Sequence, residues 1–539
     1  MRAFAALFAA LDATTKTGAK TEALAAYFRS APPQDRVWTI ALLSGRRPKR
    51  SVNSTELRTW AAEAAGIPLW LFEEAYPIVG DLSETITLVL PPPTQDSDPG
   101  LTQMLQGLIA LTGKPMEARR AAILQAWDSL PDDGRFLFNK LITGGFRMGV
   151  SQGLMTRALA LATGEAETTL AHRLMGDWNP ARVTFAALIA GDGGDGLAPY
   201  PFALASPLEA EAASLGAPSD WVAEWKWDGI RGQLIARAGG FAIWSRGEEL
   251  ITDRFPEFAP LADFLPAGTV IDGEILAWGD GQPRPFADLQ KRIGRKTVSK
   301  KLLAELPARM LAYDLLEDGG QDLRAVPLAE RRARLAELIA GLPDGLPLGL
   351  SPRVEFTDWA ALAEVRATAR AQMAEGLMLK EAASGYHVGR KRGSWWKWKL
   401  DPYSVDAVMI YAQSGSGRRA TLFTDFTFAV RDGNDLVPFT KAYSGLTDAE
   451  FRQITAWVNK HTLERFGPVR RVPAELVFEI GFEGIQASAR HKSGIALRFP
   501  RMLRWRQDKG VADIDTLDGL RALLAASAGG PAPRTPGDI

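Results

Sequence analysis

The chain has 539 residues, of which 46% are hydrophobic and 23% are charged, and its formal net charge is zero. This length exceeds what one hydrophobic core serves and suggests about three domains of ordinary soluble, globular composition. No apolar run approaches the roughly 20 residues of a membrane-spanning helix. Because the protein as a whole is not basic, any contact with a polyanion must come from local patches.

Cysteine is absent from the sequence, which excludes disulfides and thiolate metal sites such as zinc ribbons. The four histidines are scattered without metal-ligand spacing and suit surface or core positions. The apolar run over residues 4–11 is short and is not followed by a cleavage site. An amphipathic first helix therefore explains this run better than a secretory signal does.

The first 190 residues show helical periodicity almost throughout, for example over residues 4–11 and 101–109. Loops interrupt the pattern at residues 44–50, with the sequence SGRRPKR, and at residues 91–100. The glycine-rich stretch 191–196 then marks a boundary. We therefore predict an all-α domain over residues 1–190.

Residues 200–400 alternate short β-rich runs with Gly, Asp and Pro turns, which predicts an α+β domain with much antiparallel sheet. A helix is expected within it at residues 327–342. Strands are expected at residues 241–244, 270–276, 310–315 and 377–380.

Short strands dominate again over residues 401–524, with one helix near residues 447–460. This rhythm suits a small β-barrel such as an OB-fold. Residues 525–539 are expected to form a disordered tail. The strands of the barrel are expected at residues 407–411, 426–430 and 476–480.

The chemistry of the chain centres on residues 224–231, EWKWDGIR. Lys226 lies in a Trp-flanked run that predicts a half-buried strand, and Asp228-Gly229 supplies a turn that returns Arg231 toward the same pocket. Partial desolvation and nearby cations lower the pKa of a lysine, whose free amine can then attack an electrophile. Taken alone, the stretch is explained equally well by a surface strand with a snorkelling lysine.

Five further stretches follow in order, and each alone is weak, because a strand-end carboxylate or alternating lysines usually form a solvated face. They are residues 245–247 (SRG), 271–275 (IDGEI), 312–315 (AYDL), 375–380 (EGLMLK) and 395–399 (WWKWK). Together with the Lys-x-Asp-Gly-x-Arg pattern of residues 226–231, they resemble the nucleotide-pocket motifs of the covalent nucleotidyltransferases. This superfamily comprises ATP-dependent DNA ligases, RNA ligases and mRNA capping enzymes.

The resemblance implies a role for each matching residue. Lys226 would take AMP from ATP as a lysyl-nucleotide phosphoramidate, and Glu375 would bind Mg²⁺ with Asp228 as a helper. The other pocket residues would contact the base, the ribose and the phosphates. They are Glu224, Arg231, Arg246, Glu274 (ribose hydroxyls), Tyr313 (stacked on the base, where the family often has Phe), and Arg392, Lys397 and Lys399 (α-phosphate).

A basic run in the C-terminal part, residues 504–509 (RWRQDK), resembles the last ligase motif. The resemblance implies that Arg506, Asp508 and Lys509 orient the pyrophosphate leaving group. Without the resemblance, the same residues would be interpreted as a basic strand exposed to solvent. Because the run lies on a separate domain, the resemblance also implies a barrel that closes on ATP and later rotates to grip DNA.

Two stretches in the helical part, residues 79–85 and 141–151, resemble the DNA-binding domain of archaeal and eukaryotic-type replicative ligases. Glycines in the second stretch, LITGGFRMGVS, allow backbone N–H groups to approach phosphates, although a helix-connecting turn would look similar. A basic run at residues 291–301 is a further candidate for backbone contacts. The expected DNA-binding residues are Thr143, Gly144, Arg147, Gly149, Lys291 and Arg292.

These resemblances imply a three-domain ATP-dependent DNA ligase of the replicative or archaeal-like type, from a bacterium, acting as a monomer at the nucleoid in the cytoplasm without membrane contact. It would encircle nicked duplex DNA, pass AMP to the 5′-phosphate and seal the strand. The alternatives are an RNA ligase or capping-type enzyme, against which the helical domain argues, and an inactive ligase-like clamp, against which the complete pocket argues. NAD-dependent ligases are disfavoured because they typically carry a cysteine zinc site.

Overall fold

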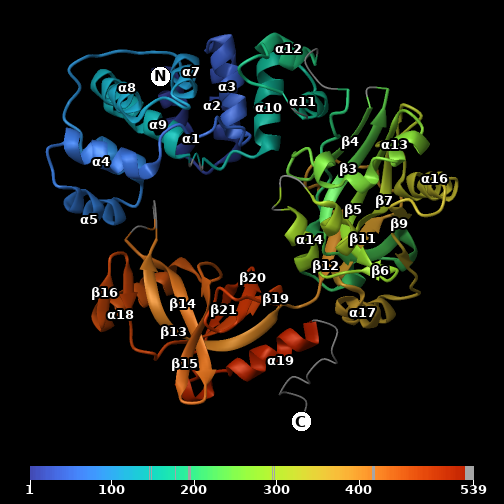
Figure 1. Cartoon of the computed structure of the whole chain (residues 1–539). Coiled ribbons are helices and arrows are strands. Elements are labelled where there is room, and N and C mark those ends of the chain that lie inside the picture. The colour runs from blue at the N-terminus through green and yellow to red at the C-terminus, as the bar shows by residue number, and fades with distance from the viewer. Residues whose placement is uncertain are drawn as a thin grey trace. The chain divides into compact units, whose positions relative to one another are not determined.

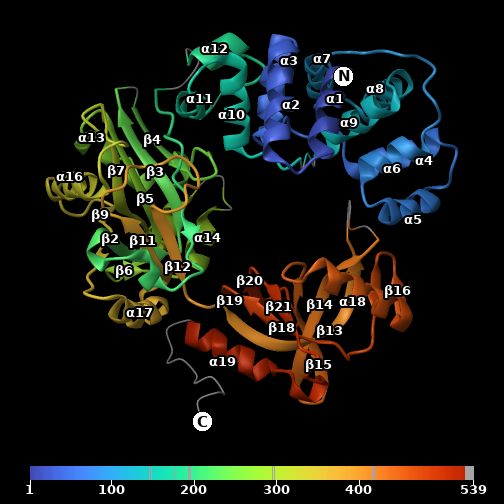
Figure 2. The ribbon, with the colours of Figure 1, turned by 180° about the vertical axis from the view of Figure 1, so that it is seen from behind.

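The computed structural model describes all residues except 145, 147, 176–177, 192–195, 239, 294, 296–297, 416–418, 420 and 528–539. The chain forms two compact units, one of Met1–Ala23, Trp38–Val150 and Pro402–Ile539, the other of Leu24–Val37 and Ser151–Asp401. Figures 1 and 2 colour the elements along the chain. In the part of the chain that the structure describes, every helix is too short or too polar to cross a bilayer.

The first 190 residues are helical, as predicted, and the expected loops at residues 44–50 and 91–100 lie between helices. Local sequence explains several helix ends: Asn53 forms a capping box with Glu56, and Asp81 and Ser151 accept from backbone N–H groups three residues on. The helices are α1 (Arg2–Asp12), α2 (Thr17–Ser30), α3 (Pro33–Leu43), α4 (Ser54–Ala64), α5 (Leu69–Val79), α6 (Leu82–Val89), α7 (Leu101–Ala110), α8 (Met116–Ser129), α9 (Asp132–Thr143), α10 (Gln152–Thr163), α11 (Glu167–Arg173) and α12 (Phe185–Ala190).

Two sheets form the middle of the chain, and both are antiparallel except for the pairs β1–β12 and β7–β9. The first has the order β1 (Ser206–Pro207), β12 (Trp395–Lys399), β11 (Ala374–Glu381), β2 (Trp221–Trp227) and β10 (Arg353–Val354). The second has the order β4 (Gly240–Ser245), β3 (Ile230–Arg237), β5 (Thr269–Gly279), β7 (Ala308–Asp318) and β8 (Gln321–Asp322), with β6 (Gln282–Pro283) on β5 and β9 (Leu348–Leu350) on β7.

Helices cover one face of each sheet. In Figures 1 and 2 the strands β3, β5 and β7 run side by side, and α16 packs against β7 and β9 through Leu335, while α17 packs against β11 through Leu362. The opposite face of the second sheet carries a further apolar cluster, which includes Ile235, Trp244 and Leu316. The helices of this part are α13 (Leu261–Phe264), α14 (Phe286–Ile293), α15 (Lys300–Glu305), α16 (Leu328–Ala340) and α17 (Trp359–Ala367).

The C-terminal part is rich in strands, as predicted, around a core that includes Phe426, Phe478 and Ile480. Its helix α19 continues to Ser527, so residues 525–527 are helical rather than part of a disordered tail, and residues 528–539 lie outside the described residues. The elements are β13 (Tyr403–Ser414), β14 (Phe423–Asp432), β15 (Asp435–Ala442), α18 (Asp448–His461), β16 (Glu464–Phe466), β17 (Val469–Arg471), β18 (Val477–Phe482), β19 (Gly484–Ala487), β20 (Ile495–Arg498), β21 (Arg501–Trp505) and α19 (Leu517–Ser527).

Candidate active site

Lys226 lies one residue before the end of β2, which pairs with β11 on one side and β10 on the other. Trp225 and Trp227 pack into apolar clusters, and because alternate strand residues face opposite ways, Glu224 and Lys226 share the other face. Gly229 follows in the predicted bend. A Cβ there would lie 2.4 Å from the carbonyl oxygen of Ile275 on β5, so only glycine allows this close approach.

The amino group of Lys226 donates to Oε2 of Glu375 at 2.5 Å, and Nζ of Lys399 lies 3.2 Å from the same oxygen. Burial would raise the pKa of Glu375, but the two ammonium groups outweigh it and hold this pKa below its usual value. Glu375 is therefore an ionised carboxylate shared by two lysines. The sequence predicted all three residues, and the structure brings them together.

Lys397 lies two residues before Lys399 on β12 and so shares its face. Burial lowers its pKa, and the nearby charges of Lys399, Arg390 and Lys226 lower it further. Lys397 thus adds a third positive charge near the carboxylate that Lys226 and Lys399 share. A pocket with this excess of positive charge suits a polyphosphate.

Glu274 faces this pocket from the second sheet, where it is the cross-strand partner of Arg231. Burial raises the pKa of Glu274 to about 7, and the charges of Lys226 and Arg231 counteract only part of this effect. Its carboxyl group therefore titrates near neutral pH. Glu274 and Lys226 interact electrostatically although they lie on different sheets.

Arg231 is held by Asp272, through Nε to Oδ1 at 3.1 Å and Nη2 to Oδ2 at 2.6 Å. Its Nη2 also donates to the hydroxyl of Tyr386 at 3.1 Å, and that hydroxyl donates to Asp272 at 2.6 Å. Burial alone would lower the pKa of Arg231, but Asp272 raises it well above its usual value. Asp272 was not predicted from the sequence, although its spacing of two residues from Glu274 on a strand was a usable signal.

Tyr313 on β7 is 9% exposed, and its hydroxyl donates to Asp272 at 3.3 Å. Nζ of Lys380 lies 4.1 Å from the centre of its ring, and the guanidinium carbon of Arg231 lies 5.9 Å from it. These cation–π contacts help to orient the ring. Tyr313 is therefore nearly buried beside two cations, and its expected stacking on the base stays a prediction.

Glu224 is only 1% exposed and holds two cations that the sequence analysis did not select. Its Oε2 accepts from Nζ of Lys380 at 2.7 Å, and its Oε1 lies 2.8 Å from Nη1 of Arg332 on α16. The carboxylate is thus part of a buried ion-pair network directly beside the pocket. Arg332 gave no signal in the sequence, because it occupies an ordinary position in a charged helix.

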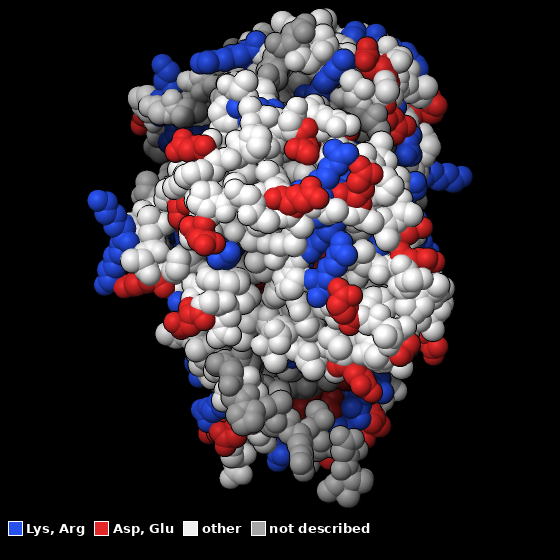
Figure 3. All heavy atoms as spheres, turned by 90° about the vertical axis from the view of Figure 1, so that its right-hand side faces the viewer, with Lys and Arg blue, Asp and Glu red and all other residues white. Residues whose placement is uncertain are grey.

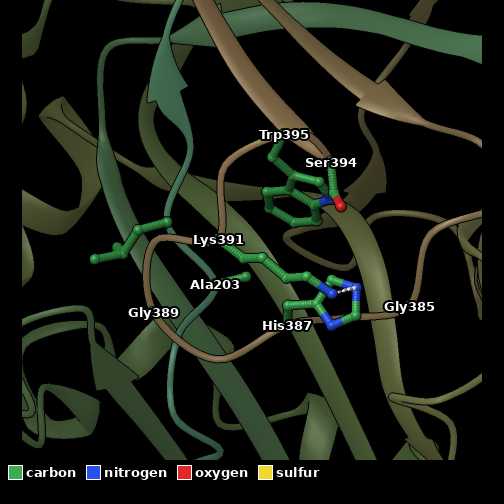
Figure 4. Close-up of a pocket in the computed structure, with 8 residues that line it drawn as sticks. Ala203, Gly385, His387, Gly389, Lys391, Ser394 and Trp395 are labelled. Atoms are coloured by element: carbon green, nitrogen blue, oxygen red, sulfur yellow. Dashed lines mark hydrogen bonds between the residues drawn. The ribbon is translucent and has the colours of Figure 1, made fainter. Parts of the chain in front are cut away.

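Arg246 and Arg392 are both exposed, Arg246 directly after β4 and Arg392 in the loop between β11 and β12. The loop also carries His387 and Lys391, whose Nε2 and Nζ atoms lie 3.3 Å apart at a small hollow beside Trp395 (Figure 4). Burial and the Lys391 charge lower the pKa of His387. The hollow has room for about one water molecule, so it is not the nucleotide pocket.

The three predicted pyrophosphate-orienting residues follow β21, and Asp406 on β13 accepts from two of them, Arg506 and Lys509. Arg506 donates to Asp508 at 2.9 and 2.7 Å and to Asp406 at 3.1 Å, and Lys509 donates to Asp406 at 2.5 Å. The hydrogen bonds with Asp508 raise the pKa of Arg506 and lower that of Asp508. The cluster therefore exists as a unit within the strand-rich part, and Asp406 is a member that the sequence analysis missed.

In the helical part, the two stretches that resemble a DNA-binding domain contact each other. The hydroxyl of Ser83 lies 3.0 Å from that of Thr143, and the carbonyl oxygen of Thr143 accepts from Arg50 at 2.7 Å. Gly144 and Gly149 have positive φ angles of 72° and 59°, which favour glycine. The expected contact residue Arg147 lies outside the described residues.

The basic loop at residues 44–50 borders this turn. A Cβ on Gly144 would lie 2.6 Å from Nη1 of Arg47, and Arg50 binds the carbonyl of Thr143. Arg47 and Arg50 are therefore candidate phosphate contacts that we did not select. The run of four cations in SGRRPKR was the available signal.

The prediction that Arg292 binds DNA is wrong. Its side chain is fully buried and donates to Glu257 at 2.5 and 2.9 Å and to the carbonyls of Leu306 and Arg254. Arg292 follows Leu289 by three residues on α14 and so lies on the buried face of that helix. Its neighbour Lys291 is exposed, with its amino group 2.7 Å from Asp288, and remains available to DNA.

Comparison with known proteins identifies the family of the chain. Family models match residues 1–160 (DNA ligase N terminus), 203–399 (ATP dependent DNA ligase domain) and 419–509 (ATP dependent DNA ligase C terminal region). A probable DNA ligase of Koribacter versatilis is 34% identical, over 94% of each chain. A probable DNA ligase of Streptomyces griseus is 32% identical over 94% of this chain and 96% of its own.

A solved structure described as Pmar-Lig_Pre shares the fold, with a TM-score of 0.63 over 93% of this chain and 99% of its own at 15% identity. A second, Pmar-Lig_PreS3, has a TM-score of 0.60 at 16% identity, over 93% of this chain and 99% of its own. The resemblance drawn from the sequence motifs is thereby confirmed. The chain belongs to the ATP-dependent DNA ligases, the enzymes that seal nicks in DNA.

Proposed function

We propose that Lys226 is the residue that carries AMP. After losing a proton, its Nζ forms a bond to the α-phosphorus of ATP while the bond to pyrophosphate breaks. The observation that carries this proposal is the pairing of Lys226 and Lys399 with Glu375, with Lys397 on the same strand face as Lys399. An isolated surface lysine would lack both the neighbouring cations and the fixed carboxylate.

We assign the remaining pocket residues to the base, the ribose or the phosphates of the nucleotide. We propose that Tyr313 stacks on the base and that Glu224 faces the edge of the base. Glu274 contacts the ribose hydroxyls, and Arg231, already fixed by Asp272, forms the adjoining wall. Lys397, Lys399 and the exposed Arg246 and Arg392 bind the phosphates, where fixed positive charge stabilises the charge on the transferring oxygens.

We propose Mg²⁺ as the cofactor, held by Glu375 with Asp228 as a helper. Among the described residues no three His, Asp or Glu side chains form a metal cage by themselves. Mg²⁺ fits such a site, because it usually takes one or two carboxylates and completes its shell with water and substrate phosphates. When bound, it would neutralise phosphate charge. The amino groups of Lys226 and Lys399 are paired with the carboxylate of Glu375. They would have to move away from it for Glu375 to bind the metal.

Nicked duplex DNA is the proposed substrate for the later steps, in which AMP passes to the 5′-phosphate and the 3′-hydroxyl then displaces it. We propose that the turn with Thr143, Gly144, Arg147 and Gly149 binds the backbone of the duplex, and that Lys291 does so too. The net charge of the chain is zero and the face drawn in Figure 3 mixes basic and acidic side chains, so contacts with DNA would depend on local groups of basic residues. We also propose that the strand-rich part is an OB-fold barrel that brings Arg506, Asp508 and Lys509 to the pyrophosphate.

The test separates the two chemical stages in one protein. Lys226→Ala is assayed with ATP and nicked DNA, and in parallel with nicked DNA that already carries AMP on its 5′-phosphate. We expect the variant to fail with the first substrate and to seal the second, because the lysine is needed only to take AMP from ATP. Sealing of the first substrate at the wild-type rate would overturn the proposal.

A further inference from the structure

The turn between α9 and α10 is attached to the neighbouring helices at three points. The ring of Phe146 packs edge-on against those of Phe4 and Phe8 on α1, with ring centres 6.0 and 6.2 Å apart. The side chain of Met148 is only 3% exposed. The third point is polar, because Nζ of Lys20 on α2 donates to the carbonyl oxygen of Met148. Residues 146 and 148 of the turn are therefore held against the helices.

Lys20 carries a buried positive charge at this attachment. Its side chain is 8% exposed, and among the described residues its amino group has the carbonyl of Met148 as partner and no carboxylate. Burying a charge costs free energy unless an opposite charge pairs with it. A neutral donor would satisfy the carbonyl equally well, so this hydrogen bond alone does not explain a lysine here. A negatively charged ligand that binds near the turn would offset part of the cost.

One peptide unit connects Lys20 to the surface of the turn. The carbonyl of Met148 and the N–H of Gly149 belong to the same trans peptide unit and therefore point in opposite directions. Because Lys20 holds the carbonyl, the N–H points away from Lys20. Gly149 is exposed, and its N–H donates to no backbone carbonyl among the described residues. An exposed N–H with a cation behind its peptide unit is a donor that suits an anion.

We propose that Lys20 is a positioning residue for the binding of nicked DNA. By holding the carbonyl of Met148, it directs the N–H of Gly149 outward as a donor to a phosphate of the DNA backbone, and its charge strengthens that donor. Lys20 itself does not touch the DNA. The inference rests on the proposed binding of DNA by this turn and goes beyond it by naming the donor and the residue that aims it.

The experiment measures binding to nicked duplexes in which one backbone phosphate at a time is replaced by an uncharged methylphosphonate. Lys20→Met should weaken binding to the unmodified duplex about tenfold, the effect of one hydrogen bond to a charged group. It should also abolish the loss that replacement of one particular phosphate causes in the wild type, because the two changes remove the same contact. Losses at the other phosphates, and lysyl-AMP formation without DNA, should match the wild type. Lys16, which is exposed four residues earlier, offers the control variant Lys16→Met, which should keep the loss at that phosphate.

Wild-type affinity in Lys20→Met, or the full wild-type loss at every replaced phosphate, would overturn the inference and leave the proposed function intact. Disappearance of the same loss in Lys16→Met would also overturn it, because general charge would then explain the effect. If the wild type neither binds nor seals nicked DNA, the proposed function itself fails. Should Lys20→Met not fold, Lys20→Gln keeps a polar group and removes the charge. It should reduce the loss at that phosphate at least about threefold, and an unchanged loss would contradict the inference.

Discussion

The adjacent residues Lys291 and Arg292 should respond in opposite ways to substitution, although both belong to one basic run. Arg292 is fully buried, and its guanidinium donates four hydrogen bonds, two of them to Glu257. Lys291 is 61% exposed, with a surface ion pair to Asp288. The two changes compared are Arg292→Met and Lys291→Ala.

The magnitude for Arg292 follows from its burial. Removing one partner of a buried ion pair costs about 3–5 kcal/mol. The Glu257 side chain is 20% exposed, so water can reach it and the lower limit applies. For a domain of roughly 200 residues, ~3 kcal/mol lowers the midpoint of thermal unfolding by about 6–12 °C. A surface pair such as Lys291–Asp288 contributes less than about 1 kcal/mol, so Lys291→Ala should barely move the midpoint.

The assay combines thermal unfolding followed by circular dichroism with binding to nicked duplex DNA at several salt concentrations. If Lys291 contacts a phosphate, Lys291→Ala should reduce the slope of log K against log salt by about 0.9. Arg292→Met, measured well below its midpoint, should leave that slope unchanged. A normal midpoint in Arg292→Met together with a reduced salt slope would refute the assignment of Arg292 to the domain interior.

Three further predictions concern the pocket and its accessory cluster. In the folded protein the pKa of Glu274 is about 7, against an ordinary 4.5. The protonated carboxyl group therefore stabilises the fold below about pH 4.5. This contribution to the free energy of unfolding, roughly 3 kcal/mol, is lost as the pH rises to about 7. Glu274→Gln should therefore gain stability relative to the wild type between pH 5 and pH 8 in urea unfolding, and parallel pH curves would contradict the burial of this carboxyl group. Gly229→Ala places a methyl group 2.4 Å from the carbonyl of Ile275, so it should reduce lysyl-AMP formation at least about tenfold by displacing the nucleophile, and normal labelling would show that the turn tolerates a side chain. Arg506→Ala should slow lysyl-AMP formation and spare the sealing of a DNA strand that already carries AMP, and an equal loss in both assays would assign this cluster to DNA rather than to pyrophosphate.

Much of the fold followed from periodicity. Short β-rich runs between turn residues located β5 and β7 within a few residues, and the helix expected at residues 327–342 is α16 (Leu328–Ala340). Periodicity could not show that β2 and β11, far apart in sequence, are neighbours, because pairing across the chain depends on tertiary contacts. It also gave no sign of β1, which is two residues long.

Site residues that belong to a sequence motif could be predicted, whereas residues that reach the site only through the packing of another element could not. Lys226, Glu375 and Lys399 were selected from the sequence and meet in the structure. Arg332 reaches the pocket from a helix, and its position in the sequence resembles that of any surface arginine. Arg292 was assigned to the surface because a basic run suggests exposure, whereas its place on the apolar side of α14 decided the outcome.

The central claim is that Lys226 is the nucleophile, and the most direct measurement is to map the covalent nucleotide. The protein, freed of any AMP already attached, is incubated with α-labelled ATP and Mg²⁺, denatured, digested and analysed by mass spectrometry. We predict one modified peptide, with AMP on Lys226, and loss of the label when unlabelled nicked DNA is added before denaturation. AMP on Lys397, Lys399 or Lys380 with Lys226 unmodified would contradict the account.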